Sequence, residues 1–343
     1  MAVKSGFLFI VLLIRLFVVL SEIPEGSYCG MRDGTEGVCV RMSSCKAEED
    51  KLKNFVFPKF CSYNLLKPTV CCSDCYSLEY SIRKSQKYSG DQYDNDVAGG
   101  VDARRTDYPH MALLGYGETP ETAEWMCGGS IISERYILTA AHCISSPTVG
   151  KITFAALGIL KRTDDFHMWQ IYDIIEIIPY PQYNPPSKYH DIALLHTGRR
   201  IRFNKEVAAA CLNRNNDMPQ RAIVTGWGSL GHNRHIADNL QVVQVDHFPD
   251  AQCSRDYPVH RLLKRGYDRN TQACYGDRRK VADTCEGDSG GPLQTGVYND
   301  HCKFLIAGIT SYGKACGFAG NAGIYTRVSH YMPWIESITG RLL

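Results

Sequence analysis

Short apolar runs separated by turn residues dominate the chain from Val97 onward. Gly, Pro, Asn and Asp break these runs, and a long helical period is rare, which is typical of an all-β protein. The clearest strands are predicted at Met111–Tyr116, Ser130–Thr139, Gln170–Ile178, Ala222–Gly226 and Phe304–Thr310. Near the C-terminus, Tyr331–Ile338 carries Trp334 and Ile335 and predicts an amphipathic helix. The pattern favours an all-β body of two barrels that ends in a helix.

The first residues follow a different pattern, an apolar run at Phe7–Leu20. This run is short for a helix that crosses a bilayer, and Arg15 interrupts it. Val19 and Ser21 are small enough for the −3 and −1 positions of a signal-peptidase site. We therefore expect residues 1–21 to be a signal peptide and the protein to be secreted. An uncleaved membrane anchor is the alternative.

Cysteine usage adds a second module to this picture. The chain has fifteen cysteines, a number that suits an oxidising compartment, and zinc-finger spacing is absent from the sequence. Six of them fall within residues 29–72, namely Cys29, Cys39, Cys45, Cys61, Cys71 and Cys72. This segment has too few apolar side chains for a core of its own, so disulfides must supply the stability. Six cysteines allow fifteen pairings, and spacing alone does not choose among them.

Between this module and the strands lies a polar segment. Residues 73–96 form a predicted linker, and from Tyr80 to Asp96 the sequence has no apolar period, so an exposed and cleavable connection is expected. The formal net charge of the whole chain is only +2. That balance indicates neither nucleic acid nor an anionic membrane as a partner.

Three short motifs carry the candidate chemistry. They supply a histidine, an aspartate and a serine in that order: Leu138–Cys143 with His142, His190–Leu195 with Asp191, and Asp283–Pro292 with Ser289. A serine hydroxyl is a weak nucleophile until a base takes its proton, and a histidine, with an ordinary pKa of about 6.5, suits that task. An aspartate that accepts a hydrogen bond from the imidazole fixes its tautomer and stabilises the imidazolium. The N–H groups of Gly287 and Ser289 are predicted to form an oxyanion hole.

In this order and combination the motifs resemble those of the chymotrypsin-like serine proteases, from Val97 to near the C-terminus. The resemblance implies an all-β fold, a chymotrypsin-like double six-stranded β-barrel with a C-terminal helix. The cysteine module resembles the clip domain of arthropod extracellular proteases of the snake and Persephone type; another small disulfide knot is the alternative. We therefore expect a clip domain at 29–72, a linker and activation segment at 73–96, and a trypsin-like serine protease domain at 97–343.

These resemblances imply a set of disulfides. The pairs are Cys29–Cys71, Cys39–Cys61, Cys45–Cys72, Cys75–Cys211, Cys127–Cys143, Cys253–Cys274 and Cys285–Cys316. The Cys75–Cys211 bond would tether the cleaved clip segment to the protease domain. Cys302 is then left over, either as a buried free thiol or in an intermolecular bridge.

The protease resemblance also implies the substrate pocket. Asp283 would form its floor and pair with Arg, or with Lys through water, so cleavage after Arg or Lys is expected. Gly313 and Gly323 match wall positions that keep the pocket open. The segment Ser311–Gly313 resembles the one that binds the substrate backbone as an added strand. The family most often has Trp where Tyr312 stands, so preferences beyond the primary pocket are expected to differ.

Activation by cleavage is expected before Val97, because the sequence that begins there resembles the start of the mature proteases. The new amine of Val97 would pair with Asp288, and a buried ion pair is tolerated only when both partners are present. The chain is therefore predicted to be a zymogen. Asp96 precedes the cut, whereas a trypsin-like activator prefers Arg or Lys. Either the activator is unusual, or cutting occurs elsewhere, for example after Lys87, followed by trimming.

The predicted function is that of a secreted serine endopeptidase in an extracellular immune or developmental cascade. Its expected partners are a protein substrate, in particular a protease zymogen, an upstream activating protease, and a serpin inhibitor. The alternative is a non-catalytic clip-domain adaptor, although homologues of that kind typically lose the serine. A digestive protease is disfavoured by the clip module. Asp164 and Asp165 lie in a loop that binds calcium in some relatives, but neither a metal nor a cofactor is expected.

Overall fold

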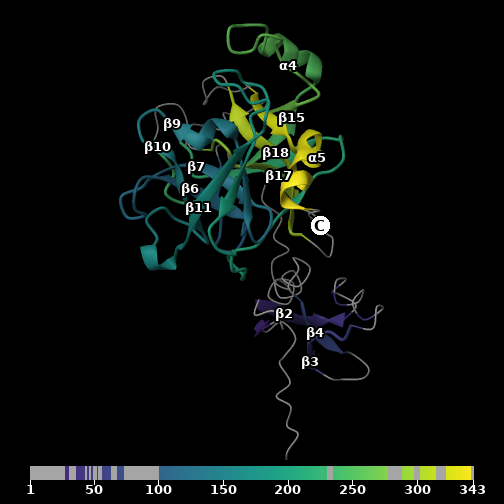
Figure 1. The fold of residues 1–343 in the computed structure, drawn as a ribbon. Helices are drawn as coiled ribbons and strands as arrows, with labels where there is room; N and C mark the ends of the chain where they lie inside the picture. The colour runs from purple at the N-terminus through teal and green to yellow at the C-terminus, as the bar shows by residue number, and fades with distance from the viewer. Residues whose placement is uncertain are drawn as a thin grey trace, which may run out of the picture. The chain divides into compact units, whose positions relative to one another are not determined.

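The structure is a computed structural model of the chain, shown in Figure 1. It describes residues 28–30, 36–42, 45, 48, 52, 56–62, 68–72, 100–229, 235–276, 288–296, 302–313 and 322–340. The chain divides into two compact units, Met1–Ser89 and Gly90–Leu343. None of the helices within the described ranges has the length and apolar character needed to cross a bilayer.

The first unit contains a small antiparallel sheet held by disulfides. Its strands follow the order β1-β2-β4-β3 and are β1 (Tyr28–Gly30), β2 (Glu36–Arg41), β3 (Phe60–Ser62) and β4 (Thr69–Cys72). Three disulfides cross it, with the pairing that the clip resemblance implies: Cys29–Cys71, Cys39–Cys61 and Cys45–Cys72. Beside these cysteines, Val70 is the main buried apolar side chain among the described residues of this unit. Covalent bonds therefore stand in for a hydrophobic core.

The second unit begins with a closed barrel of six antiparallel strands. The order is β11-β12-β8-β7-β6-β10, and β10 pairs back with β11 to close the barrel. The strands are β6 (Met111–Tyr116), β7 (Glu124–Ile131), β8 (Tyr136–Thr139), β10 (Gly150–Leu157), β11 (Gln170–Pro179) and β12 (Ala193–Thr197), with β9 (Ser145–Ser146) at the edge of β10. Leu113, Ile137 and Leu195 are fully buried in its core.

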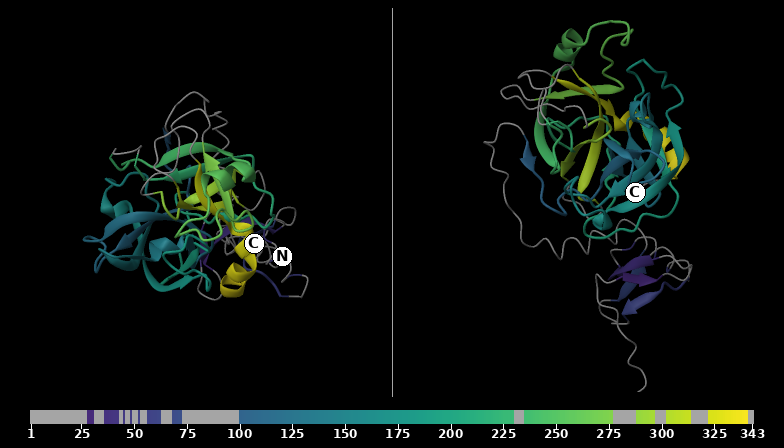
Figure 2. Two further views of the ribbon diagram at one scale, coloured as in Figure 1. Left: turned by 90° about the horizontal axis from the view of Figure 1, so that it is seen from above. Right: turned by 90° about the vertical axis from the view of Figure 1, so that its left-hand side faces the viewer.

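A second closed barrel follows, again with six strands. Its order is β18-β17-β14-β15-β16-β19, and β19 pairs back with β18. The strands are β14 (Arg221–Gly226), β15 (Gln241–His247), β16 (Gln272–Gly276), β17 (Pro292–Gly296), β18 (Phe304–Tyr312) and β19 (Gly323–Arg327). Two short strands attach to it, β5 (Val101–Asp102) on β15 and β13 (Cys211–Leu212) on β18. Figure 2 shows the first barrel in blue to teal and the second in green to yellow.

Helical segments are few in the described part of the chain. The C-terminal helix α5 (Val328–Thr339) follows β19 directly and buries Tyr331 and Ile335. A shorter helix, α4 (Asp250–Asp256), lies between β15 and β16, and two 3-10 turns, η2 (Ala141–Ile144) and η3 (Phe166–Met168), belong to the first barrel. Two barrels and a C-terminal helix confirm the predicted fold class.

One predicted strand was wrong in its extent. Ser130–Thr139 is not a single strand, because β7 ends at Ile131 and β8 begins at Tyr136. The hydroxyl of Ser133 accepts the backbone N–H groups of Arg135 and Tyr136, at 3.2 and 3.1 Å. A serine side chain that binds the backbone in this way turns the chain, and the two strands pair as a hairpin.

One predicted disulfide was also wrong. Cys211 is bonded to Cys302, with a Cα–Cα distance of 5.6 Å, and not to Cys75. Parallel pairing of β13 with β18 places Cys211 opposite Leu305, close to Cys302, which precedes the same strand. Cys302 is therefore neither a free thiol nor an intermolecular link, and the tether expected through Cys75–Cys211 does not form. Cys75 itself lies outside the described residues, as do Cys285 and Cys316.

Candidate active site

His142 and Asp191 belong to two loops that leave the first barrel at the same place. β8 leads into η2, which carries His142, and Asp191 lies just before β12, the strand that pairs with β8. The His142 Nδ1 lies 2.7 Å from the Asp191 Oδ2, and the His142 backbone N–H donates to the Asp191 Oδ1 at 2.8 Å. The disulfide Cys127–Cys143 pins the turn beside the histidine. Strand pairing and two hydrogen bonds thus fix the histidine against the carboxylate.

The second barrel holds the same aspartate. Ser311 on β18 donates its hydroxyl to the Asp191 Oδ2, and Thr326 on β19 donates to the Asp191 backbone carbonyl at 2.9 Å. Burial raises the pKa of the Asp191 carboxyl, but the charge and hydrogen bonds of His142 and the hydrogen bond from Ser311 outweigh burial, so this pKa lies below its usual range. Asp191 is therefore ionised at neutral pH and oriented from both barrels.

Ser289 lies on the loop before β17, pressed against the segment that leads to His142. The Ser289 carbonyl accepts the N–H of Gly128 at 2.8 Å. Gly290 has a φ of 79°, and a Cβ at this position would lie 2.2 Å from the Thr139 Oγ1 and 2.5 Å from the Gly128 carbonyl oxygen. Only glycine fits such an approach. The loop is thus seated beside β8, and direct contact between the imidazole and the serine hydroxyl stays a prediction.

Asp288, the predicted partner of the activation amine, occupies a notch formed by two glycines. Its Oδ1 accepts the N–H of Gly228 at 2.9 Å. A Cβ on Gly226 would lie 2.1 Å from that oxygen, and one on Gly228 would lie 2.5 Å from the carboxyl carbon. Sequence reasoning missed these glycines, although a Gly-Trp-Gly step after a strand is a signal that could have found them. Val97 and Asp96 lie outside the described residues.

The two predicted walls of the substrate pocket face one another where β18 and β19 pair. A Cβ on Gly313 would lie 3.7 Å from the Gly323 Cα, and no other described atom is as close as 4 Å. A side chain at Gly313 would therefore lie against the backbone of Gly323. The predicted floor, Asp283, and the oxyanion residue Gly287 lie outside the described residues, so their roles stay predictions.

A further support of Asp191 was missed, because nothing in the sequence pattern marks it. His190 has a φ of 57°, a left-handed conformation that is uncommon for a side chain of this size. Its Nδ1 lies 3.1 Å from the Tyr331 hydroxyl, and its ring stacks on Tyr180. Burial lowers the pKa of His190, and the charges of His330 and Arg265 act in the same direction. A neutral ring thus anchors the residue before the aspartate to α5.

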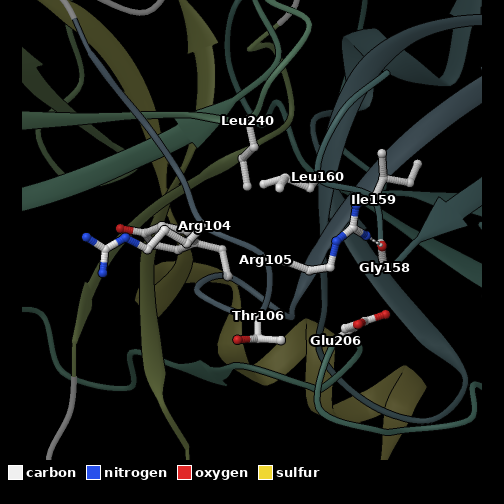
Figure 3. Close-up of a pocket in the computed structure, with 9 residues that line it drawn as sticks. Arg104, Arg105, Thr106, Gly158, Ile159, Leu160, Glu206 and Leu240 are labelled. Carbon is white, nitrogen blue, oxygen red and sulfur yellow. Dashed lines mark hydrogen bonds between the residues drawn. The ribbon is translucent and has the colours of Figure 1, made fainter. Parts of the chain in front are cut away.

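Asp164, in the loop considered for calcium, is engaged by the protein itself. The Arg105 Nη2 lies 2.8 Å from both carboxylate oxygens, and the N–H groups of Leu160 and Lys161 donate to the Oδ2 at 3.0 and 2.9 Å. Burial raises the pKa of Asp164, but these donors outweigh it and the pKa is lowered. Figure 3 shows the small pocket beside this pair, where Arg105 also donates to the Gly158 carbonyl at 3.4 Å. The guanidinium of Arg105 is thus already paired with this carboxylate.

One group of side chains that includes His142 has the residue types of a metal site. The ligand atoms of Cys127, Cys143 and His142 lie within 4.8 Å of one another. The two sulfurs are joined in a disulfide, however, and a metal binds the thiolate rather than the disulfide. This group is therefore a structural bridge next to the histidine.

Comparison with known proteins agrees with this geometry. The family model described as Trypsin matches residues 83–335. The chain belongs to the trypsin family of serine proteases. More narrowly, it is a clip-domain serine protease, since it carries the disulfide-linked N-terminal sheet and resembles proteins of that kind over most of its length.

Several insect proteases align with nearly the whole chain. Serine protease snk of Drosophila melanogaster is 32% identical over 350 residues, which cover 93% of this chain and 80% of that protein. Phenoloxidase-activating factor 1 of Holotrichia diomphalia is 30% identical over 356 residues, covering 92% and 94%. CLIP domain-containing serine protease B4 of Anopheles gambiae is 31% identical over 342 residues, covering 91% of each.

Proposed function

We propose that the chain is the secreted zymogen of a serine endopeptidase that cleaves proteins after Arg or Lys. The observation that carries this proposal is the buried, ionised Asp191 bound to His142, with the Ser289 loop seated against the same segment. An aspartate held from two barrels has a clear use as the orienting partner of a general base. A leader cleaved after Ser21 would direct the chain to the secretory pathway.

In the proposed reaction, Ser289 attacks the carbonyl carbon of the scissile peptide bond. His142 accepts the hydroxyl proton as the bond forms and then donates it to the leaving amine. Asp191 keeps the imidazole in the tautomer whose Nδ1 carries a proton and stabilises the charge that develops on it. The N–H groups of Gly287 and Ser289 bind the oxyanion. Water then releases the acyl group by the same steps.

Specificity for Arg or Lys rests on Asp283 as the floor of the pocket. A buried carboxylate discriminates strongly, because an uncharged guest would leave it unpaired. The lack of a side chain at both Gly313 and Gly323, which lie against one another, supports a pocket entrance that a long basic side chain can pass. The Ser311–Gly313 segment is assigned to the substrate backbone, which would add there as a strand.

Activation follows from the notch around Asp288. Cleavage before Val97 would create an ammonium group that pairs with the Asp288 carboxylate and settles the loop that carries Ser289. The close fit of Gly226 and Gly228 around that carboxylate supports a position fixed by its surroundings. The domain limits are then a clip domain at 29–72, an activation segment at 73–96 and a protease domain at 97–343.

The natural role proposed is activation of another protease in an extracellular cascade. Relatives that align over nearly the whole chain include a phenoloxidase-activating factor, and another relative is called Melanization protease 1. These names support a protein substrate that is activated by cleavage. An upstream activating protease and control by a serpin, in an immune or developmental pathway, complete the proposal.

A direct test uses the full chain with residues 92–96 replaced by Asp-Asp-Asp-Asp-Lys, so that enteropeptidase releases Val97. We expect the cleaved protein to hydrolyse peptide amides after Arg and Lys, and to react with a fluorophosphonate probe at Ser289. The Ser289→Ala variant serves as the control and should lose both properties. A cleaved, folded protein that neither reacts with the probe nor hydrolyses any peptide would instead support the clip-domain adaptor.

A further inference from the structure

A strongly basic loop lies beside the proposed substrate strand. Between residues 255 and 269 the chain has five Arg or Lys residues and two Asp residues, although the whole chain is close to neutral at +2. The five are Arg255, Arg261, Lys264, Arg265 and Arg269, and all of them are exposed. The loop begins at α4, which stands out from the barrels in Figure 1. Such a local excess of charge creates a positive field at the surface.

Tyr312 connects this loop to the active site. Ser311, the residue before it, donates to the catalytic Asp191, so Tyr312 is the next position outward along β18. The Tyr257 ring packs edge-on against the Tyr312 ring, with centroids 5.7 Å apart. Tyr257 belongs to the basic segment, and the disulfide Cys253–Cys274 secures the start of that segment to β16. The basic segment therefore contacts β18 at Tyr312, where a substrate strand bound along Ser311–Gly313 would extend away from the triad.

Lys188 adds a cation at the same place. Its Nζ lies over the Tyr312 ring, 5.6 Å from the centroid. Its backbone is fixed by two hydrogen bonds, its N–H to the Leu262 carbonyl at 3.1 Å and its carbonyl to the Gln272 amide at 3.1 Å. Among the described residues, no acidic side chain lies within 4 Å of this ammonium group. Lys188 is half-buried, and its charge lies beside Tyr312.

Tyr189, the residue after Lys188, contacts another cation of the loop. The Tyr189 hydroxyl accepts the N–H of Arg265 at 2.7 Å, and the Arg265 guanidinium lies 4.7 Å from the centroid of the Tyr189 ring. Arg265 is also paired with Asp268, at 3.9 Å. In the described part of the chain, Arg261 and Lys264 have no comparable acidic partner. Both side chains are exposed, so a ligand can reach them.

We propose that Lys188, Arg261, Lys264 and Arg265 form a basic surface that selects an acidic stretch of the protein substrate a few residues before the scissile bond. This inference rests on the proposed function, which lays the substrate backbone along Ser311–Gly313. A substrate side chain that passes Tyr312 meets Lys188 first and the loop cations further out. Long-range attraction between opposite charges also speeds the encounter of two proteins.

The test uses the enteropeptidase-activated full chain and pairs of peptide amides that all carry Arg at the cleaved bond. Within a pair, the second, third or fourth residue before the bond is Glu in one peptide and Gln in the other. We expect Glu to raise kcat/KM by about fivefold at one position or more, the effect of one well-placed ion pair near a protein surface. The ratio should shrink as ionic strength rises, because salt screens exposed charges.

Variants show whether the named cations are responsible. In Lys188→Met the Glu-to-Gln ratio should fall toward one, and the combined Arg261→Gln, Lys264→Gln and Arg265→Gln variant should lower the ratio for the outermost position. Lys205→Met is the matched control, because Lys205 is 75% exposed, pairs with Glu206 and lies between β12 and β13, outside the basic segment. This control should keep the parent ratio.

The outcomes separate the two proposals. Cleavage of neither peptide would overturn the proposed function, since every peptide carries Arg. Cleavage of both peptides at equal rates, unchanged in the variants, would overturn the acidic-substrate surface alone. If the loop variant lost binding to heparin or to vesicles containing phosphatidylserine while the Glu-to-Gln ratio stayed at one, the surface would be assigned to a polyanion or a membrane, and this proposal would be wrong.

Discussion

The two barrels of the protease unit contribute to the candidate active site by different physical means. The first barrel supplies His142 and Asp191, which are brought together by the pairing of β8 with β12 and locked by two hydrogen bonds. The second supplies Ser289 on a turn whose position depends on the missing side chain of Gly290. The positions of His142 and Asp191 depend on hydrogen bonds between polar groups, whereas the position of Ser289 depends on the absence of a side chain at Gly290. Substitutions should therefore affect the two halves unequally.

The largest effect is expected for Gly290→Ala, which tests the second barrel's contribution. The new Cβ would overlap the Thr139 Oγ1 and the Gly128 carbonyl, and a φ of 79° is unfavourable for alanine. The serine loop must then move, and a displacement of about 1 Å can cost about 100-fold in rate. We expect kcat/KM of the activated chain to fall at least about 100-fold, measured with an Arg peptide amide.

Gly296→Ala is the matched control for this change. A Cβ at Gly296, at the end of β17, would have no neighbour within 4 Å among the described residues. Activity and thermal midpoint should stay close to those of the parent chain. A Gly290→Ala enzyme with full activity would show that the close approach does not seat the serine.

A second prediction concerns the contact between the two barrels at His110, called the seam below, where the His110 side chain is buried. Its ring contacts the Phe304 ring of β18, with centroids 4.9 Å apart. Burial lowers the pKa of His110 to about 3; the nearby Gln294 side chain opposes the shift, and the charge of Lys303 adds to it. The unfolded chain then binds a proton between about pH 6.5 and about 3 that the folded chain does not bind. This group therefore costs stability as the pH falls below about 6.5, by about 2 kcal/mol at pH 5.

Urea unfolding of the protease unit in the full chain, at pH 7.5 and pH 5, measures this difference. In His110→Gln the part of the acid sensitivity that comes from this ring should disappear, so the gap between the two pH values should narrow by about 2 kcal/mol. His167→Gln is the control, because that side chain is 87% exposed. An equal gap in the parent and in His110→Gln would show that the seam does not depend on a neutral ring.

Local pattern was enough to predict much of this fold. Met111–Tyr116 and Phe304–Thr310 are continuous apolar runs, and each lies within a barrel strand. The errors came from interactions that a hydrophobic pattern does not contain. The Ser133 hydroxyl turns the chain within the predicted strand Ser130–Thr139, and the parallel pairing of β13 with β18 brings Cys211 to Cys302 across a long stretch of sequence.

The candidate site was predicted about as completely as the fold. His142 and Asp191 were identified by their motifs, and the structure joins them. The supports of the aspartate were harder to find. Thr326 and His190 act through a hydroxyl on a distant strand and through a left-handed backbone, and neither leaves a mark in a single sequence. Residues that orient other residues are selected by tertiary contact, so short motifs do not reveal them.

A third prediction tests how far the second barrel helps to hold the aspartate of the first. Ser311→Ala removes the hydroxyl that donates to the Asp191 Oδ2, while both hydrogen bonds from His142 remain. Loss of one hydrogen bond to a buried charge should lower kcat by about tenfold and leave KM for an Arg peptide nearly unchanged. Thr310→Val is the control, since the Thr310 hydroxyl has no hydrogen-bond partner among the described residues. Equal activity of Ser311→Ala and Thr310→Val would show that His142 alone orients Asp191.

The smallest expected effect concerns the segment that joins the two barrels. β5 pairs with β15 of the second barrel, and a few residues later Arg105 binds Asp164 in a loop of the first. The side chains of this pair are 29% and 11% exposed, and backbone N–H groups share the carboxylate, so Arg105→Gln should lower the free energy of unfolding by about 1 kcal/mol.

The ion pair of Arg221 with Asp246 provides the comparison, because its side chains are 72% and 43% exposed. Arg221→Gln should change the free energy of unfolding by much less, since water and salt screen an exposed pair. Urea unfolding of both variants at low and high salt measures the difference. The loss of stability in Arg105→Gln should persist at high salt. Backbone N–H groups hold the Asp164 carboxylate in place, so the substitution removes its guanidinium partner at any ionic strength. Equal effects of the two substitutions would mean that the bridge between the barrels is held by β5 and its apolar neighbours alone.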